Sequence, residues 1–91
     1  MSVRVRVFYP ELQRLINSPG ELRVEGETVG DCLVDLARGH RGARELLFDK
    51  QGRLHKHVYV YVNAEGMYKA DLTRAIAERD ELILAVLATA G

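Results

Sequence analysis

The last residues of the chain carry the chemistry that is easiest to name. An apolar run beginning at Leu82 gives way to small residues and stops at Gly91. A terminal glycine carboxylate is the least hindered one that a protein can offer, because no Cβ atom crowds an attack on it. Enzymes that activate protein C-termini need such access. The competing interpretation is that chain ends often fray and often finish in small residues.

The elements that must position this end begin with two predicted strands. Apolar residues alternate with charged ones in 3–7 and in 22–25, which is the pattern of a strand with one buried face. Between them, 11–17 is compatible with a helical turn or a loop. The turn signal Ser18-Pro19-Gly20 follows, so we expect a fairly long connection or an extended hairpin.

The clearest helix is predicted from an N-cap at Thr28 to a last residue at Gly39. Asp31 stands three residues after Thr28 as a weak capping-box partner. Apolar residues then recur at helical spacing, at positions 29, 32, 33, 36 and 37. A second, short helix is predicted over 43–48.

Two further strands complete the pattern. In 57–62, three valines alternate with His57, Tyr59 and Tyr61, and the turn 63–66 follows. Met67 and Tyr68 are a candidate short strand. Segment 81–87 is apolar on both faces, which favours a central place in the sheet. The first strand beside such a central last strand would run parallel to it.

This order of elements predicts an α+β protein of the β-grasp type. We expect a mixed sheet of four or five strands with one main helix across one face. The domain would span 1–87, and 88–91 would form a flexible C-terminal tail. Ninety-one residues allow one core.

Composition argues against several functions. Lys+Arg and Asp+Glu both number 13, so we expect no nucleic-acid partner. The apolar stretch 82–88 is too short to cross a bilayer and the N-terminus has no apolar signal core, so we expect no membrane association and a cytoplasmic protein. Cys32 is the only cysteine, which excludes an internal disulfide.

Several features together resemble the ubiquitin-like sulfur-carrier proteins. They are Gly52-Arg53-Leu54, the valine-rich strand that runs into Asn63, the Asp80-Glu81 turn into the last strand, and the distance from that turn to Gly91. The family includes the small subunit of molybdopterin synthase, the thiamine-pathway carrier and carriers that feed cysteine synthesis. The resemblance covers nearly the whole chain.

The resemblance implies a substrate of partner enzymes, with no catalytic residues of its own. An E1-like adenylyltransferase would use ATP to adenylate the Gly91 carboxylate. A sulfur donor would convert the adenylate into a thiocarboxylate. A sulfur-accepting synthase subunit would then admit the tail Ala88, Thr89 and Ala90 and take the sulfur. The carrier itself would bind no cofactor.

The tail departs from the family pattern at two places. The family usually ends in two glycines, whereas Ala90 precedes Gly91 here, and a methyl group restricts the backbone in a narrow channel. The family also often carries proline near Val86 and Leu87, which would hold the tail extended. An Ala-Gly carrier, a homologue without conjugation, and a shortened or processed chain are all compatible with this end.

A docking face is predicted on the side of the sheet away from the helix. Alternation places Tyr59, Tyr61, Ile83 and Ala85 there, and aromatic and apolar residues on a solvent-facing sheet are typical of partner binding. The competing interpretation is that scattered apolar residues on a sheet are normal.

Other candidate residues favour structural interpretations. His55 and His57 alternate along the predicted strand, with His40 as a third possible ligand, but we expect surface histidines and no metal site. Cys32 on the apolar helix stripe is expected to be a small buried hydrophobe.

The remaining charges and glycines are less specific. A group of four cations is compatible with a basic docking patch or with solvated strand edges; its members are Arg4, Arg6, Arg53 and Lys56. No glycine-rich phosphate loop is present, and we expect turns at Gly26, Gly39, Gly52 and Gly66.

Three functional hypotheses follow. The first is a sulfur carrier thiolated at Gly91. The second is a β-grasp interaction module or subunit without carrier chemistry, which the Ala90 departure favours. The third is a modifier whose Gly91 is joined to a target lysine by an isopeptide bond.

Overall fold

The structure is a computed structural model that describes residues 2–17, 21–63 and 71–86. Within these ranges the chain forms four strands and three helices. In order they are β1 (Ser2–Phe8), α1 (Pro10–Ile16), β2 (Glu21–Glu25), α2 (Val29–Gly39), α3 (Ala43–Leu47), β3 (Val58–Val62) and β4 (Glu81–Val86). The predicted turn from residue 64 onward, the strand at 67–68 and the tail 88–91 lie outside the described residues.

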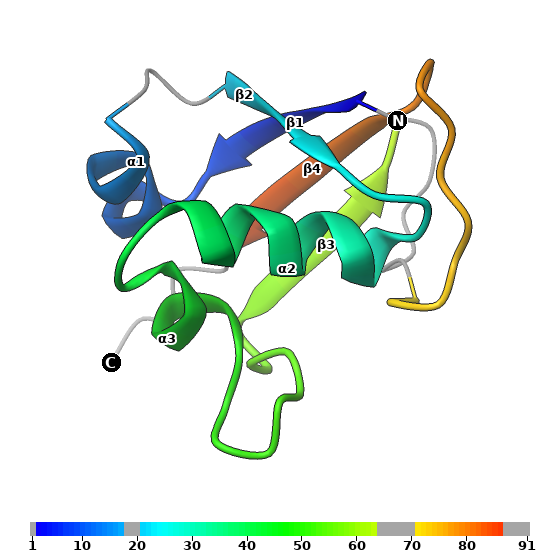
Figure 1. The fold of residues 1–91 in the computed structure, drawn as a ribbon. Helices are drawn as coiled ribbons and strands as arrows, with labels where there is room; N and C mark the ends of the chain where they lie inside the picture. The colour runs from blue at the N-terminus through cyan, green and yellow to red at the C-terminus, as the bar shows by residue number, and fades with distance from the viewer. Residues whose placement is uncertain (1, 18–20, 64–70, 87–91) are drawn as a thin grey trace.

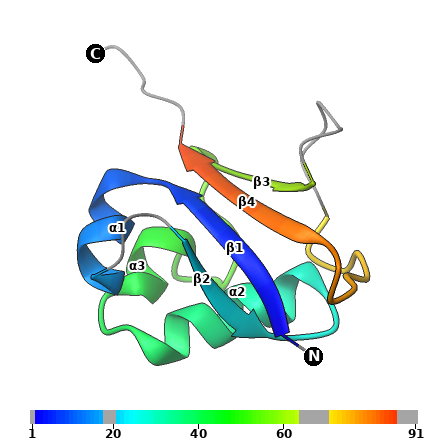
Figure 2. The ribbon, with the colours of Figure 1, turned by 90° about the horizontal axis from the view of Figure 1, so that it is seen from above.

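The strands form one mixed sheet in the order β2-β1-β4-β3. β1 and β4 are parallel neighbours at its centre, and β2 and β3 pair antiparallel with them at the two edges. Helix α2 crosses one face of this sheet, with α1 and α3 beside it (Figures 1 and 2). The predicted β-grasp fold, including the central last strand parallel to the first, is confirmed.

Helix α2 begins where the sequence predicts. The hydroxyl of Thr28 accepts a hydrogen bond from the backbone N–H of Asp31 at 3.1 Å, which satisfies one of the donors left free at a helix start. The carboxylate of Asp31 accepts from the N–H of Glu27 at 3.4 Å, one residue earlier than a standard capping box. Gly39 is the last residue of the helix, as predicted.

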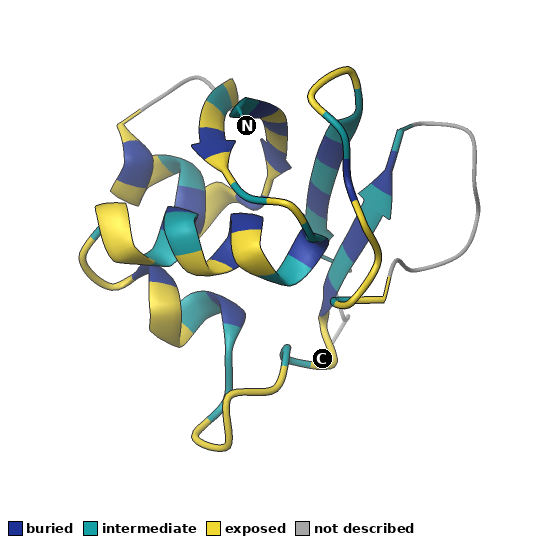
Figure 3. Cartoon of the chain, turned by 45° about the vertical axis from the view of Figure 1, so that its right-hand side comes forward, coloured by how far each residue is buried: buried dark blue, intermediate teal, exposed yellow. Residues whose placement is uncertain are grey.

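One apolar core lies between the sheet and the helices. The inward residues of β1, β3 and β4 pack against the apolar stripe of α2, and Leu33, Leu82 and Leu84 are fully buried. No polar or charged residue is buried among the described residues. Figure 3 shows the resulting bands of buried and less buried residues along the strands.

In segment 11–17, which the sequence left open between helix and loop, residues 11–16 belong to helix α1. Pro10 occupies the start of α1, where its missing N–H costs nothing. Leu12 and Ile16 lie four residues apart and are both buried. Asn17 then ends the helix in the left-handed region at φ 51°. The four-residue spacing of Leu12 and Ile16 is the feature of the sequence that indicates a helix here.

One strand boundary differs from the prediction. β3 begins at Val58, so His55 and His57 lie in the preceding segment, and the prediction that they alternate along a strand is wrong. None of the helices in the described ranges is long and apolar enough to span a membrane.

Candidate functional site

The outer face of the sheet brings the four predicted docking residues together. Tyr59 lies opposite Ala85, and Tyr61 lies opposite Ile83, in the antiparallel β3–β4 ladder. Each of the four alternates with a buried residue and is itself of intermediate exposure. Their side chains therefore form one patch on the face away from α2, as predicted.

The two tyrosines make the aromatic part of this patch. The rings of Tyr59 and Tyr61 stack nearly parallel, with centroids 6.5 Å apart and planes 10° apart. A tyrosine offers a rigid apolar surface and a hydroxyl at its rim, and both are useful at a protein interface. Neither ring is buried, so the pair is accessible from solvent.

Phe8 extends the patch onto β1, and the prediction omitted it. Phe8 lies opposite Ala85 in the parallel β1–β4 ladder, and 52% of its surface is exposed. The guanidinium carbon of Arg6 lies 5.3 Å from the centre of its ring, within the range of a cation–π contact. The signal was available, because Phe8 follows Arg4 and Arg6 in the same alternation. We call Phe8, Tyr59, Tyr61, Ile83 and Ala85 the outer patch.

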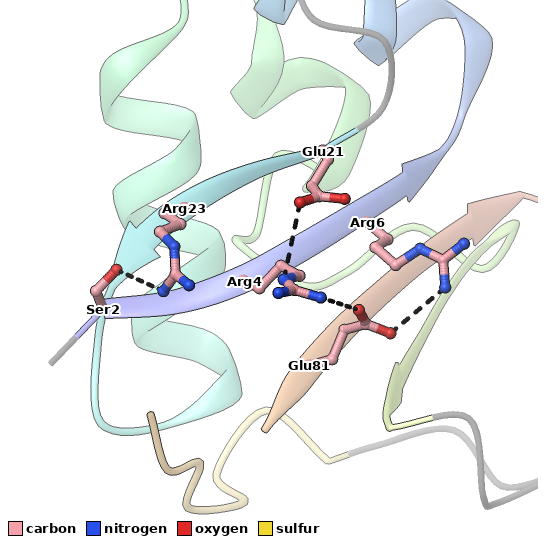
Figure 4. A network of polar contacts seen from close by, with 6 residues as sticks. All are labelled: Ser2, Arg4, Arg6, Glu21, Arg23 and Glu81. Carbon is pink, nitrogen blue, oxygen red and sulfur yellow. Dashed lines mark hydrogen bonds and ion pairs between the residues drawn. The ribbon is translucent and has the colours of Figure 1, made fainter. Parts of the chain in front are cut away.

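Charged residues cover the neighbouring part of the same face. Glu81 lies within 3.6 Å of both Arg4 and Arg6, and Arg4 also lies 3.8 Å from Glu21 (Figure 4). These side chains are largely exposed apart from Glu81, so the ion pairs add little stability. They divide the sheet face into a polar half and an apolar half.

The predicted group of four cations does not act as one basic patch. Arg4 and Arg6 are paired with carboxylates on β1 and β4. Arg53 lies in the segment after α3 and pairs with Asp49 at 3.5 Å. Lys56 is exposed in the segment before β3.

The outer patch adjoins the end of β4 from which the last residues continue. Ala85 is the next to last residue of β4, and its neighbours Phe8 and Tyr59 belong to the same row of the sheet. A protein docked on this row would lie beside the point where the chain leaves the sheet. Residues 88–91, including Gly91, lie outside the described residues.

A polar clamp fixes the other end of β4. The side-chain carbonyl of Asn63 accepts from the N–H of Glu81 at 2.9 Å, and its amide donates to Asp80 at 3.2 Å. Asp80 also accepts from the N–H of Ala77 at 2.8 Å. These hydrogen bonds, the backbone one first, hold the pKa of Asp80 below its ordinary value. The Asn63 and Asp80 of the sequence pattern thus anchor the strand that leads to the tail.

The three histidines have different partners, and only His55 and His57 contact each other. The rings of His55 and His57 stack with centroids 5.2 Å apart, while Nε2 of His57 lies 3.4 Å from the Tyr9 hydroxyl. His40 instead contacts the carbonyl of Leu36 through Nδ1 at 3.1 Å. Within the described ranges, no three His, Cys, Asp or Glu side chains are grouped to hold a metal ion.

Cys32 is inaccessible in the core. Its surface is fully buried, and burial, with smaller contributions from Asp31, Asp35 and Glu25, raises the pKa of the thiol to about 11. A reactive cysteine needs exposure and positive neighbours, so Cys32 serves as an apolar side chain of α2.

Several solved structures resemble the chain over nearly its full length. The SAMP1 protein of Haloferax volcanii is 31% identical, with complete coverage of both chains and a TM-score of 0.84. The CysO antigen of Mycobacterium tuberculosis is 30% identical over 90% of this chain and 97% of its own, with a TM-score of 0.73.

A third similar structure is the BexX/CysO complex of Amycolatopsis orientalis. The match has 25% identity over 96% of this chain and 99% of the other, with a TM-score of 0.76. No family model matches the sequence, and no curated protein matches it. The fold, the identity and the complete coverage agree, and the chain belongs to the ubiquitin-like β-grasp sulfur-carrier proteins, a family of small carriers and modifiers.

Proposed function

We propose that the chain is a sulfur carrier that is activated and thiolated at Gly91. The observation that carries this proposal is the position of the outer patch, which adjoins the exit end of β4. A partner docked on the patch lies next to the segment that ends in the terminal glycine. Exposed aromatic and apolar residues beside the end of a strand that is paired on both sides support this proposal, because a delivered substrate needs a surface to dock on and a fixed strand behind its tail.

The activation step explains why the carrier needs a partner. A carboxylate is a poor electrophile until one of its oxygens belongs to a good leaving group. In the proposed step a Gly91 carboxylate oxygen attacks the α-phosphorus of ATP, pyrophosphate leaves, and an acyl-adenylate forms. A hydrosulfide equivalent from the sulfur donor then attacks the carbonyl carbon. The new C–S bond forms as the bond to AMP breaks, which leaves a thiocarboxylate.

The length of the last segment is compatible with docking at the outer patch and activation at a separate site of the partner. Five residues follow Val86, and fully extended they reach at most about 18 Å. An E1-like adenylyltransferase could therefore hold the outer patch at its surface and still receive Gly91 in a recessed site. The proposed sulfur acceptor is a synthase subunit that would admit Ala88, Thr89 and Ala90 in the same way. Activation consumes ATP, so we place the carrier in the cytoplasm, with no cofactor bound to the chain itself.

The deciding experiment is mapping of the C-terminal peptide of the protein from its native host. The last Lys or Arg is Arg79, so trypsin releases 80–91 as one peptide, which contains neither Cys32 nor Met1 nor Met67. Oxidation of a methionine changes the mass by nearly the same amount as replacement of an oxygen by a sulfur. The peptide that is measured must therefore contain no methionine. We expect a mass increase on 80–91 equal to the difference between a sulfur and an oxygen atom, and an alkylation product on the same peptide. A plain carboxylate after incubation with an E1-like enzyme, ATP and a sulfur source would contradict the proposal.

Variants at the end of the chain separate the chemistry from the fold. Gly91→Ala, or deletion of Gly91, is expected to abolish transfer and leave the unfolding transition unchanged. Ala90→Gly restores the double glycine of the family pattern and serves as the matched control, since it should still be thiolated. Thiolation of either Gly91 variant would contradict the assignment of Gly91 as the thiolated residue.

A second candidate is a protein modifier, because one of the similar structures is named small archaeal modifier protein 1. Its activation step is the same and its acceptor is a target lysine. Digestion of a conjugate would then leave 80–91 attached to that lysine through an isopeptide bond. An interaction module without carrier chemistry, which Ala90 favours, would give neither product and would keep its function when the tail is trimmed.

A further inference from the structure

A second surface feature lies on the helical side of the molecule. It is a cleft of about 430 Å³ between the flank of α2, helix α3 and the segment that follows α3. Its lining residues are Val34, Ala37, Arg38, Arg44, Phe48 and Gly52. Because α2 covers the inner face of the sheet (Figures 1 and 2), this cleft lies on the opposite side of the molecule from the outer patch.

The floor of the cleft is apolar and partly exposed. Val34 lies off the buried stripe of α2 and exposes 48% of its surface. Ala37 and Phe48 are of intermediate exposure, and Phe48 is held beside the cleft by an isolated antiparallel bridge to Leu54. An exposed valine on a helix and a half-buried phenylalanine on the adjoining segment give a place for one apolar side chain.

The rim of the cleft is positively charged. Arg38 and Arg44 belong to the lining, and none of the described residues that line the cleft is a carboxylate. The side chain of Arg38 is 75% exposed, and its ion pair with Asp35 measures 4.0 Å, so its guanidinium remains open to solvent. The chain as a whole has no net charge, which makes this pair of arginines a local feature.

The surface beyond Phe48 carries charges of both signs. It includes a second hollow of about 480 Å³, which Arg44 and Phe48 also line, together with Glu45, Asp49, Lys50 and His55. Asp49 already accepts hydrogen bonds from the N–H groups of Gln51 and Arg53, both at 2.9 Å. Glu45 and Asp49 line this second hollow, whereas the charged residues among the described lining of the cleft are the two arginines Arg38 and Arg44.

We propose that this cleft binds a short acidic segment of a partner protein. One apolar side chain of the segment would lie over Val34, Ala37 and Phe48. Its carboxylates would pair with Arg38 and Arg44, since guanidinium groups match carboxylates in geometry and charge. The interaction does not involve Gly91, so the carrier could be held by this side while its outer patch and tail engage another protein.

The test is a titration of the full, isotope-labelled chain followed by amide NMR. The probes are acetylated hexapeptides of the form Asp-Glu-Xaa-Xaa-Asp-Glu, in which Xaa is Leu, Phe or Met. Saturable shifts are expected at the amides of Val34, Ala37, Phe48 and Gly52, with a dissociation constant below about 1 mM, typical of a small transient contact. Peptides with Asn and Gln in place of the acids should bind about tenfold more weakly.

Two charge-reversal variants distinguish binding in the cleft from nonspecific electrostatic attraction to the chain. Arg44→Glu should weaken binding of the acidic peptides about tenfold or more. Arg14→Glu, an exposed change on α1, alters the net charge equally and should leave binding within about twofold. The amide spectra of both variants also report whether the fold is intact. Absence of shifts in the cleft, equal binding of the neutral peptides, or equal loss in both variants would each overturn the proposal.

Discussion

Tyr61 lies directly opposite Ile83 in the β3–β4 ladder, and both side chains point away from α2. Arg6 lies opposite Ile83 on its other side, in the parallel β1–β4 ladder. Ile83 is thus the centre of a row that runs from the polar half of the sheet face to the aromatic half. Because Ile83 is only of intermediate exposure, a change there alters the docking surface without opening a cavity in the core.

Ile83→Asp is expected to weaken binding to the E1-like adenylyltransferase. A charge at the centre of the outer patch must be desolvated on docking, and such central residues carry most of the binding energy. We expect a loss of about tenfold or more in affinity, measured by calorimetry. The free energy of unfolding, from urea titration, should fall by about 1 kcal/mol or less.

Leu15→Asp is the matched control for this prediction. Leu15 is also an apolar residue of partial exposure, at 40%, but it lies on α1. It should keep its affinity for the same enzyme within about twofold. Unchanged binding by Ile83→Asp, or an equal loss in both variants, would remove the outer patch as the docking face.

Gly26 is needed for close packing, and we expect Gly26→Ala to destabilise the fold. A Cβ atom at this position would lie 2.8 Å from the backbone nitrogen of Cys32 and 2.9 Å from its sulfur. The start of α2 would have to shift, at a cost of about 1–3 kcal/mol. Gly39→Ala is the control, because a Cβ atom placed there would have no described atom within 4 Å apart from its chain neighbours and its own helix backbone. The midpoint temperature of thermal unfolding should fall clearly in Gly26→Ala and should not fall in Gly39→Ala.

The sequence predicted the sheet and the place of Tyr59, Tyr61, Ile83 and Ala85 on its outer face, because both depend on alternation. The valines of β1 and β3 specify which face is buried, and this places Tyr59 and Tyr61 on the other face without any knowledge of contacts. Thr28 specified the start of α2 through its local hydrogen bond. These features act over a few residues, so a single sequence contains them.

Features that depend on partners distant in the sequence could not be predicted in this way. The pairing of Glu81 with Arg4 and Arg6 requires the parallel register of strands more than seventy residues apart. The cleft beside Val34 requires α2, α3 and Gly52 to come together. Phe8 is a different case, because its place in the alternation of β1 is visible in the sequence; the strand was predicted over 3–7, which left out its last outward residue.

Cys32 is expected to resist alkylation in the native protein. The thiol is fully buried, and its pKa of about 11 leaves little thiolate at pH 8. Iodoacetamide should therefore label it only in denaturant, and a native-state label on 80–91 can be read without interference. Labelling of Cys32 in buffer, at a rate close to that of the unfolded chain, would show that α2 opens readily and would contradict this burial.

The clamp at the start of β4 should make stability depend on acid pH through Asp80. Its folded pKa lies below the ordinary value, because the N–H of Ala77 and then the amide of Asn63 donate to the carboxylate. A lowered folded pKa means that the stabilisation is complete above the unfolded pKa and is lost as the pH falls through the folded one.

Asp80→Asn should therefore lower the free energy of unfolding by about 1 kcal/mol at pH 7. The difference from the unsubstituted protein should narrow as the pH falls below the ordinary pKa of an aspartate, since the carboxylate of Asp80 becomes protonated as the pH passes through its lowered folded pKa. Urea titrations at several pH values measure both effects. Glu78→Gln, at an exposed position nearby, should show no such narrowing. A difference that stays constant from neutral to acid pH would mean that the charge of Asp80 does not hold the clamp.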